Sequence, residues 1–326
     1  MEERTYREAL IAAKREAMRA DPAVVILGED VGPYGGTFGV TQGLFEEFGP
    51  ERVIDTPISE AGFTGAAVGA ALTGLRPIVE LKFIDFTLVA MDQLINQAAK
   101  VHFMMGGQGR LPVVFMVAIG VTRGAAAQHS QSLHAFFVHV PGFKVVMPST
   151  PHDAKGLLSS AIADDGPVMF IAHKRLFPQR GHFPENPYRI PLGEAAIRKK
   201  GGDLTIVATS FMVNHAIEAS GQLAAIGIQA EVIDLRSLVP MDTGVVLESV
   251  RKTGRLVVAD EGHLACGVAA EVAALVQKDA FDYLDAPIER VGTPAAPVPF
   301  SEPLEEAYAL GPGQIVAAAR RTLGIF

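Results

Sequence analysis

The sequence contains a single cysteine, Cys266, among its 326 residues. One cysteine cannot form a disulfide within the chain or build a zinc cluster, so the sequence favours a protein of a reducing compartment. A thiol nucleophile is the weaker interpretation, because a lone cysteine at the start of an expected helix is more often a packing residue. We therefore predict a cytoplasmic protein without internal disulfides.

Basic residues and long apolar runs are also scarce. Lysine and arginine total 28 against 36 aspartates and glutamates, which argues against a protein that holds nucleic acid through its phosphates. The longest apolar run, 113–121, is far shorter than the roughly 20 residues that cross a bilayer. The first residues carry mixed charges and lack the apolar centre of a signal peptide. The sequence therefore predicts neither a nucleic-acid partner nor a membrane.

Several common motifs are missing as well. No G-x-G-x-x-G follows an expected strand, and the nearest match, GGQGRLP at 106–112, runs into a proline and a strand instead of a helix. The sequence has no Walker loop, no H-E-x-x-H and no G-x-S-x-G. These absences argue against a dinucleotide site, a P-loop enzyme, a zinc protease and an α/β-hydrolase.

Short segments rich in β-branched residues recur along the chain, with helical stretches between them. Most are apolar throughout rather than alternating, which is typical of parallel sheets covered on both faces. The alternation of strand and helix indicates an α/β fold with doubly wound sheets. The expected strands are 24–30, 77–83, 112–120, 144–149, 168–174, 204–210, 230–237 and 255–262, and the expected helices include 85–105, 149–164, 212–227, 242–254 and 266–281.

One segment interrupts this alternation. Residues 174–193 are rich in proline and show neither a helical period nor a clear strand, which is typical of a linker. We predict a first domain at 1–180, a proline-rich linker at 181–201 and a second domain at 202–326.

A lone carboxylate, Glu60, stands between an apolar run and a segment of small residues. Gly62, Gly65 and Gly69 fall on one helical face, which lets another helix or backbone approach closely. One interpretation is a helix start, at which the helix dipole favours Ser59 or Glu60. The other is a carboxylate in an apolar cleft, with a raised pKa, that shares a proton with a bound base.

Phe86 and His129 follow the carboxyl ends of two expected strands, the edge at which α/β sheets bind ligands. Phe83 and Phe86 are able to stack a flat heterocycle, and the alternative is ordinary core packing. His129 stands in an expected loop between an alanine run and a helix, and it is a candidate acid, base or polar anchor. His129, His134 and His139 share no helical face, so we do not expect a metal triad.

Several segments, taken in order, resemble one family. They include GEDVG (28–32), DTPISEAGFTGAAVGAA (55–71), DQLINQAAK (92–100), AAAQHSQS (125–132), PGFKVVMPSTPHDAKGLL (141–158) and EVIDLRSLVPMD (231–242). The chain resembles the beta subunit of the thiamine-diphosphate-dependent component of 2-oxo acid dehydrogenase complexes, a branch of the transketolase-like enzymes. The resemblance implies a thiamine-pyrimidine-binding domain with a parallel sheet, followed by a transketolase C-terminal-like domain.

The resemblance implies roles for particular residues. Glu60 matches the glutamate that hydrogen-bonds the ring nitrogen of the cofactor's aminopyrimidine, a contact through which the reactive ylide forms. Phe86 matches the ring that packs on the aminopyrimidine, and Ile58 is a further cofactor-binding residue. His129 matches the histidine that handles the bound intermediate or the incoming lipoyl group.

Metal ions and partners are implied in the same way. The resemblance implies a monovalent cation, potassium, with ligands at Ala161, Ile162, Asp164 and Gly166. The magnesium–diphosphate clamp of single-chain thiamine enzymes has no counterpart in this sequence. The chain therefore holds half an active site, and an alpha subunit holds the magnesium. The implied assembly is an α2β2 heterotetramer with a second beta subunit and a lipoyl-bearing acyltransferase core.

The favoured activity is that of an oxidoreductase that cleaves pyruvate or acetoin and acylates lipoamide, active only with an alpha subunit. Branched-chain members usually carry a tyrosine before the catalytic His-Ser-Gln, where this chain has Gln128. The alternatives are a branched-chain 2-oxo acid dehydrogenase beta subunit and a split transketolase-like enzyme on sugar phosphates, which needs more basic residues than this site offers. A non-catalytic scaffold is a further alternative, and the presence of Glu60, Phe86 and His129 argues against it.

Overall fold

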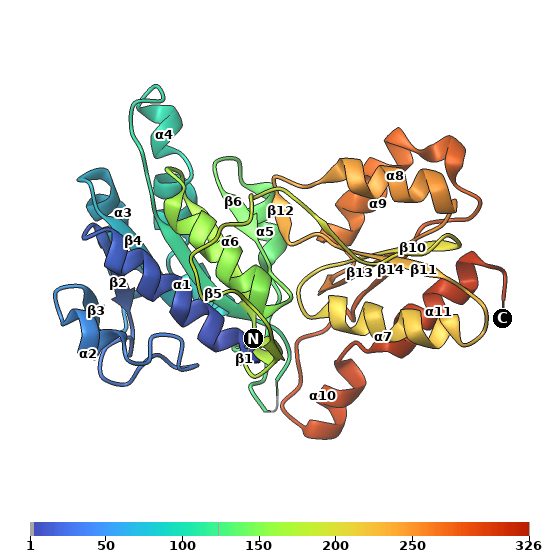
Figure 1. The fold of residues 1–326 in the computed structure, drawn as a ribbon, viewed down its shortest axis with the longest axis horizontal. Helices are drawn as coiled ribbons and strands as arrows, with labels where there is room; N and C mark the ends of the chain where they lie inside the picture. The colour runs from blue at the N-terminus through green and yellow to red at the C-terminus, as the bar shows by residue number, and fades with distance from the viewer. Residues whose placement is uncertain (1–2, 123, 326) are drawn as a thin grey trace. The chain divides into compact units, whose positions relative to one another are not determined.

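The computed structural model describes residues 3–122 and 124–325, which fall into two units (Figure 1). The first unit comprises the chain up to Ile119 together with Phe136–Leu192, and the second comprises Gly120–Ala135 together with the chain from Gly193 on. His129 therefore belongs to the second unit, although the sequence placed it within a first domain at 1–180. None of the helices in the described ranges is long and apolar enough to span a membrane.

The first unit contains a parallel sheet whose strands lie in the order β6-β7-β5-β4-β2-β3. Strands β5 and β7 are buried along their whole length, as expected for a sheet covered on both faces. A short antiparallel pair, β1 and β8, joins the ends of the unit. The strands are β1 (Arg4–Thr5), β2 (Val24–Gly28), β3 (Val53–Asp55), β4 (Arg76–Phe83), β5 (Val114–Ile119), β6 (Lys144–Val146), β7 (Val168–His173) and β8 (Arg180–Gly181).

Helices α1 and α6 lie side by side in this unit (Figure 1). A capping box between Thr5 and Glu8 begins α1. The Thr150 side chain accepts from the backbone N–H of Asp153 to begin α6, with Pro151 in the first turn of a helix predicted at 149–164. The helices are α1 (Tyr6–Ala20), α2 (Leu44–Phe48), α3 (Glu60–Leu72), α4 (Val101–Met104), α6 (Pro151–Ala163), the short η3 (Lys174–Leu176) and α5 (His134–His139), whose first two residues belong to the second unit.

The segment 85–105 differs from the single helix that the sequence predicted. It forms a 3₁₀ turn, η1 (Ile84–Leu88), a π-helical stretch, η2 (Asp92–Ala98), and the short α4. The buried Thr87 hydroxyl donates to the carbonyl of Ile84 at 2.6 Å. This local bond closes a tight turn and competes with a regular α-helix at the point where β4 ends.

The second unit contains a sheet in the order β14-β13-β10-β11-β9, in which β9 is antiparallel and the other strands are parallel. Helices α8 and α9 cover one face, and α7 and α11 cover the other (Figure 1), which confirms the doubly wound prediction. Strand β9 lies within the segment predicted as a linker. The elements are β9 (Ala196–Lys199), β10 (Leu204–Ala208), α7 (Met212–Ala224), β11 (Ala230–Asp234), β12 (Ser237–Val239), α8 (Thr243–Thr253), β13 (Leu256–His263), α9 (Val268–Asp279), η4 (Phe281–Tyr283), β14 (Glu289–Thr293), α10 (Glu302–Tyr308) and α11 (Pro312–Thr322).

Candidate active site

Glu60 is the first residue of α3, just beyond the carboxyl end of β3. Ser59 precedes the helix but makes no side-chain cap, so the helix-start interpretation rests on position and not on a capping bond. The residue is only 8% exposed. The positive end of the helix dipole favours a carboxylate at this place.

No hydrogen bond or ion pair engages the Glu60 side chain within residues 3–122 and 124–325. Burying a carboxylate without a donor is costly, and buried polar groups in folded proteins usually have partners. A donor from outside the described chain is therefore the natural complement of Glu60. The ring nitrogen of an aminopyrimidine that shares a proton with the carboxylate fits this requirement.

A second buried acid, Glu29, lies in the turn after β2 and is close enough to Glu60 for the charge of Glu60 to act on it. Burial raises the pKa of Glu29, the ion pair with Lys82 at 3.3 Å partly counters this, and the charge of Glu60 adds to the increase. Lys82 also pairs with Asp30 at 2.5 Å. Glu29 belongs to the GEDVG segment, but the sequence alone assigned it no role. The sequence signal that could have identified Glu29 is its place as a charged residue directly after the buried strand β2.

Phe86 and Ile58 lie in the same unit as Glu60. The Phe86 ring is half-buried and meets Phe83 edge to face, with centroids 5.9 Å apart. The Ile58 side chain is 79% exposed, two residues before Glu60. An aromatic face and an exposed aliphatic group suit the packing of a flat heterocycle. The cofactor contacts of Phe86 and Ile58 stay predictions.

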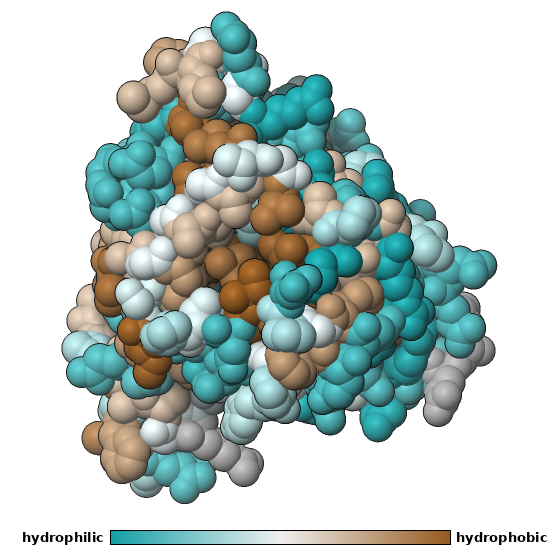
Figure 2. Space-filling view, turned by 90° about the vertical axis from the view of Figure 1, so that its left-hand side faces the viewer, coloured by the Kyte–Doolittle hydropathy of each residue, from teal (hydrophilic) through white to brown (hydrophobic). Residues whose placement is uncertain are grey.

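The small-residue face of α3 is largely uncovered in this chain. Gly62, Ala66 and Gly69 are exposed, and a Cβ at Gly69 would meet no atom within 4 Å. Figure 2 shows hydrophobic residues gathered on this side of the first unit. The exposed apolar side chains of the first unit include Ile54, Ile58, Leu72, Leu88, Val89, Phe103 and Met104. This face offers the close approach that the glycine spacing predicted.

His129 lies in the second unit, in a loop before α5, as the sequence predicted. The residue is half-buried, and its backbone N–H donates to the carbonyl of Ala126 at 3.4 Å. Ala126 has a φ of 57°, so a left-handed turn sets the direction of the chain into His129. His134 is fully buried and His139 is exposed, so the three histidines do not form a cluster.

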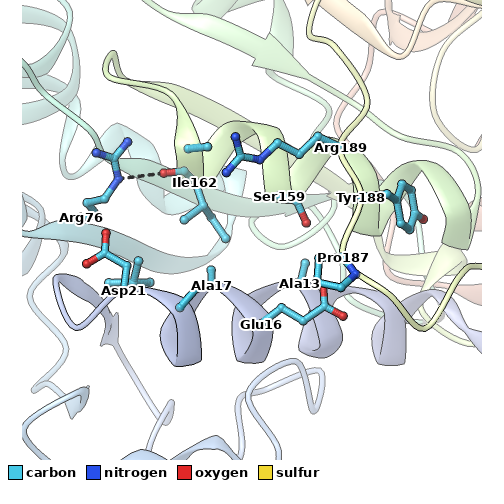
Figure 3. Close-up of a pocket in the computed structure, with 13 residues that line it drawn as sticks. Ala13, Glu16, Ala17, Asp21, Arg76, Ser159, Ile162, Pro187, Tyr188 and Arg189 are labelled. Carbon is cyan, nitrogen blue, oxygen red and sulfur yellow. Dashed lines mark hydrogen bonds between the residues drawn. The ribbon is translucent and has the colours of Figure 1, made fainter.

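The expected potassium ligands lie in the first unit, at the end of α6. The Arg76 guanidinium donates to the carbonyl of Ile162 at 3.1 Å, drawn as a dashed line in Figure 3, and to the carbonyl of Asp164 at 2.9 Å. The Asp164 carboxylate pairs with Lys144 at 2.5 Å and accepts from the Gly166 N–H at 2.8 Å. These groups are already engaged with positive charges and donors. The contacts therefore give a potassium site little support.

Two family models match the chain in the order that the fold suggests. The model described as the transketolase pyrimidine-binding domain matches residues 2–179, and the model described as the transketolase C-terminal domain matches residues 193–315. A solved structure of a split-gene transketolase, an inactive beta4 tetramer, is 27% identical and covers 98% of each chain with a TM-score of 0.80. The two-unit architecture is therefore that of the transketolase-like enzymes.

Closer relatives narrow the family. The beta subunit of acetoin:2,6-dichlorophenolindophenol oxidoreductase from Bacillus subtilis is 47% identical, with 97% of this chain and 96% of the relative covered. The pyruvate dehydrogenase E1 component subunit beta from Rickettsia felis is also 47% identical, with 97% of both covered. The chain belongs to the family of pyruvate and acetoin dehydrogenase E1 beta subunits. The residues that match the pyrimidine-binding domain, 2–179, include Glu60.

Proposed function

We propose that the chain is the beta subunit of a thiamine-diphosphate-dependent enzyme that cleaves acetoin or pyruvate together with an alpha subunit. The observation that carries this proposal is the largely buried Glu60 carboxylate at the start of α3, which has no hydrogen bond or ion pair among the described residues. Family membership supports the cofactor, and relatives named for acetoin and for pyruvate support the substrate class.

Each predicted residue has a separate task in this proposal. Thiamine diphosphate, when bound, supplies the carbon nucleophile that attacks the substrate carbonyl. Glu60 holds and exchanges a proton at the ring nitrogen of the aminopyrimidine, while Phe86 packs on that ring and Ile58 lines its site. Glu60 is largely buried, and a low dielectric around the carboxylate strengthens the proton-sharing contact. His129 serves acyl transfer to the lipoyl group of the acyltransferase core.

An alpha subunit completes the site in this proposal. The sequence lacks the magnesium–diphosphate clamp, so the alpha subunit holds magnesium and the diphosphate. The uncovered α3 face supports a close neighbour in an α2β2 assembly. The beta4 tetramer of the split-gene transketolase is described as inactive, which supports the expectation that beta chains alone do not catalyse. Potassium stays a prediction, and no step depends on it.

Reconstitution tests the proposal. We expect the purified chain to show no thiamine-dependent turnover alone, and to gain it when it is co-expressed with the alpha chain of the same organism. Dye reduction with acetoin, pyruvate and a branched 2-oxo acid ranks the substrates, and acylation of a lipoyl domain tests the acceptor. Turnover of a ketose phosphate in place of these substrates, or full activity of the isolated chain, would contradict the proposal.

A further inference from the structure

The His129-bearing segment 120–133 contains no helix or strand among its described residues. A cavity of about 670 Å³ borders it, lined from the segment by Val121, Gln128 and Ser130 among others. The buried Ser130 hydroxyl has no hydrogen-bond partner within the described chain. Within the segment, Val121 packs in a small apolar cluster with Val298 and Tyr308. Polar contacts add to the hold on the segment.

Two carboxylates of the second unit accept hydrogen bonds from the backbone of this segment. Glu261, on β13, accepts from the N–H of Val121 at 2.9 Å. Glu305, on α10, accepts from the N–H of Gly124 at 2.9 Å. Both acids are buried, at 9% and 5% exposed. These contacts hold the part of the segment that precedes His129.

A third carboxylate, Asp260, holds the part that follows His129. Both of its oxygens lie near Nε2 of His134, at 3.0 and 3.1 Å. Asp260 also accepts from the Thr209 hydroxyl at 2.5 Å and from the Gly262 N–H at 3.0 Å. The ends of β10 and β13 therefore fix Asp260, and Asp260 in turn fixes His134.

The His134–Asp260 pair is the most deeply buried of these contacts, at 0% and 1% exposed. Burial alone lowers the pKa of His134, but the charge and hydrogen bond of Asp260, with the charge of Glu261, outweigh burial and raise the pKa. Burial alone raises the pKa of Asp260, and the attraction and hydrogen bonds of its partners outweigh burial and lower it. Both shifts favour the ionised form of the pair. Each buried charge is costly without the other, so the pair enforces one geometry.

We propose that Asp260 and His134 are positioning residues that set the place of His129 for acyl transfer. The pair acts through the chain between His129 and His134 and does not touch the reacting atoms. This inference rests on the proposed function, because it assigns the pair to the step that His129 serves. Loss of the pair lets His129 move and slows transfer to the lipoyl group. The Glu60-dependent activation of the cofactor in the first unit stays unchanged.

The α2β2 holoenzyme carrying Asp260→Asn separates the two steps. Acylation of a lipoyl domain measures acyl transfer, and reduction of 2,6-dichlorophenolindophenol measures substrate cleavage without the lipoyl group. We expect acylation to fall about 10- to 100-fold, the loss that a displacement of about 1 Å produces, while dye reduction stays within about twofold. Asp234→Asn is the matched control, because Asp234 is also fully buried and pairs with Arg198 at 2.7 Å. The control should not change the ratio of the two rates.

A double variant completes the test. Asp260→Asn added to His129→Ala should acylate lipoyl domains no more slowly than His129→Ala alone, because the pair acts only through His129. If the Asp260→Asn chain does not assemble, Thr209→Val takes its place, because it removes one hydrogen bond to Asp260. The rates of lipoyl acylation and of dye reduction are then compared in the same way. Equal losses in both rates, or a loss in neither, would overturn the proposal. A failure of the proposed function is distinguishable from these outcomes, because the wild-type holoenzyme would then show no thiamine-dependent dye reduction.

Discussion

Glu60 in the first unit and Asp260 in the second are both buried carboxylates, at 8% and 1% exposed, yet they differ in what holds them. Asp260 accepts from His134, Thr209 and Gly262. Glu60 has no hydrogen bond or ion pair within the described residues. A buried carboxylate needs a donor, so Asp260 completes a contact inside the chain, whereas Glu60 awaits a donor from outside. In the proposed function, the first unit is therefore the one that other molecules complete.

The largest expected effect is that of Glu60→Gln. In the proposed function Glu60 exchanges a proton with the cofactor, so we expect exchange of the thiazolium C2 proton in the α2β2 holoenzyme to fall about 100-fold or more. The unfolding midpoint should not fall, because the substitution leaves no hydrogen-bond partner unpaired among the described residues. Proton exchange is followed by NMR after acid quench, and unfolding by calorimetry.

Glu46→Gln is the control for this prediction, because Glu46 is an exposed acid on α2. It should change neither the exchange rate nor the midpoint. If Glu60→Gln kept the wild-type exchange rate, Glu60 would have no part in the mechanism. If it sharply lowered the midpoint, Glu60 would have a structural partner.

Regular features of the fold could be predicted from the sequence because their causes are local. The run 114–119 is apolar throughout and forms the fully buried β5, and α6 forms within the helix predicted at 149–164, with Thr150 as its cap. The broken helix after β4 could not be predicted in the same way. Its 3₁₀ turn depends on the Thr87 hydroxyl bonding its own backbone, which helix periodicity does not register.

The candidate site was predictable only where one residue carries the signal. Glu60 stood out as a lone charge among small neutral residues, and the structure buries it. The contacts that hold the His129 segment were not predictable, because Asp260 and His134 are 126 positions apart and meet only in the folded chain. The ion pairs of Lys82 with Glu29 and Asp30 were not predicted, because a lysine at the end of a strand usually faces solvent.

Gly69→Leu tests whether the α3 face of the first unit binds the alpha subunit. Its expected effect is smaller than that of Glu60→Gln. The new side chain meets open space in the isolated chain, and replacement of a helical glycine should stabilise that chain by about 0.5–1 kcal/mol. In the assembly the side chain blocks close approach to α3, and we expect affinity for the alpha subunit to fall about tenfold or more, an overpacking cost of about 1–3 kcal/mol. Calorimetry of the isolated chain and ultracentrifugation with alpha subunit measure the two effects.

The matched control is Gly221→Leu in α7 of the second unit. Gly221 is also an exposed helical glycine whose Cβ would meet no atom within 4 Å. It should stabilise the isolated chain in the same way and leave the affinity for the alpha subunit unchanged. Equal affinities for the Gly69→Leu and wild-type chains would show that the α3 face does not meet the alpha subunit.

The smallest expected effect is the pH dependence of the His134–Asp260 pair. The pKa of His134 is raised in the folded chain, so its contribution to stability is complete below the ordinary histidine pKa and is lost as pH rises through the raised value. The pKa of Asp260 is lowered, so its contribution is present above the ordinary aspartate pKa and is lost as pH falls through the lowered value. The charged groups that act on His134 within the described chain are Asp260 and Glu261, both on β13. The pair should therefore stabilise the second unit across neutral pH and weaken on the alkaline side.

Unfolding midpoints of wild type and His134→Gln, compared from pH 6 to pH 10, give the measurement. We expect the stability difference between the two proteins to be largest near pH 6 and to shrink as the imidazolium loses its proton. Other groups that titrate in this range cancel in the comparison, because they are common to both chains. A difference that stays constant over the whole range would mean that His134 is neutral throughout, and that Asp260 holds the segment by a hydrogen bond alone.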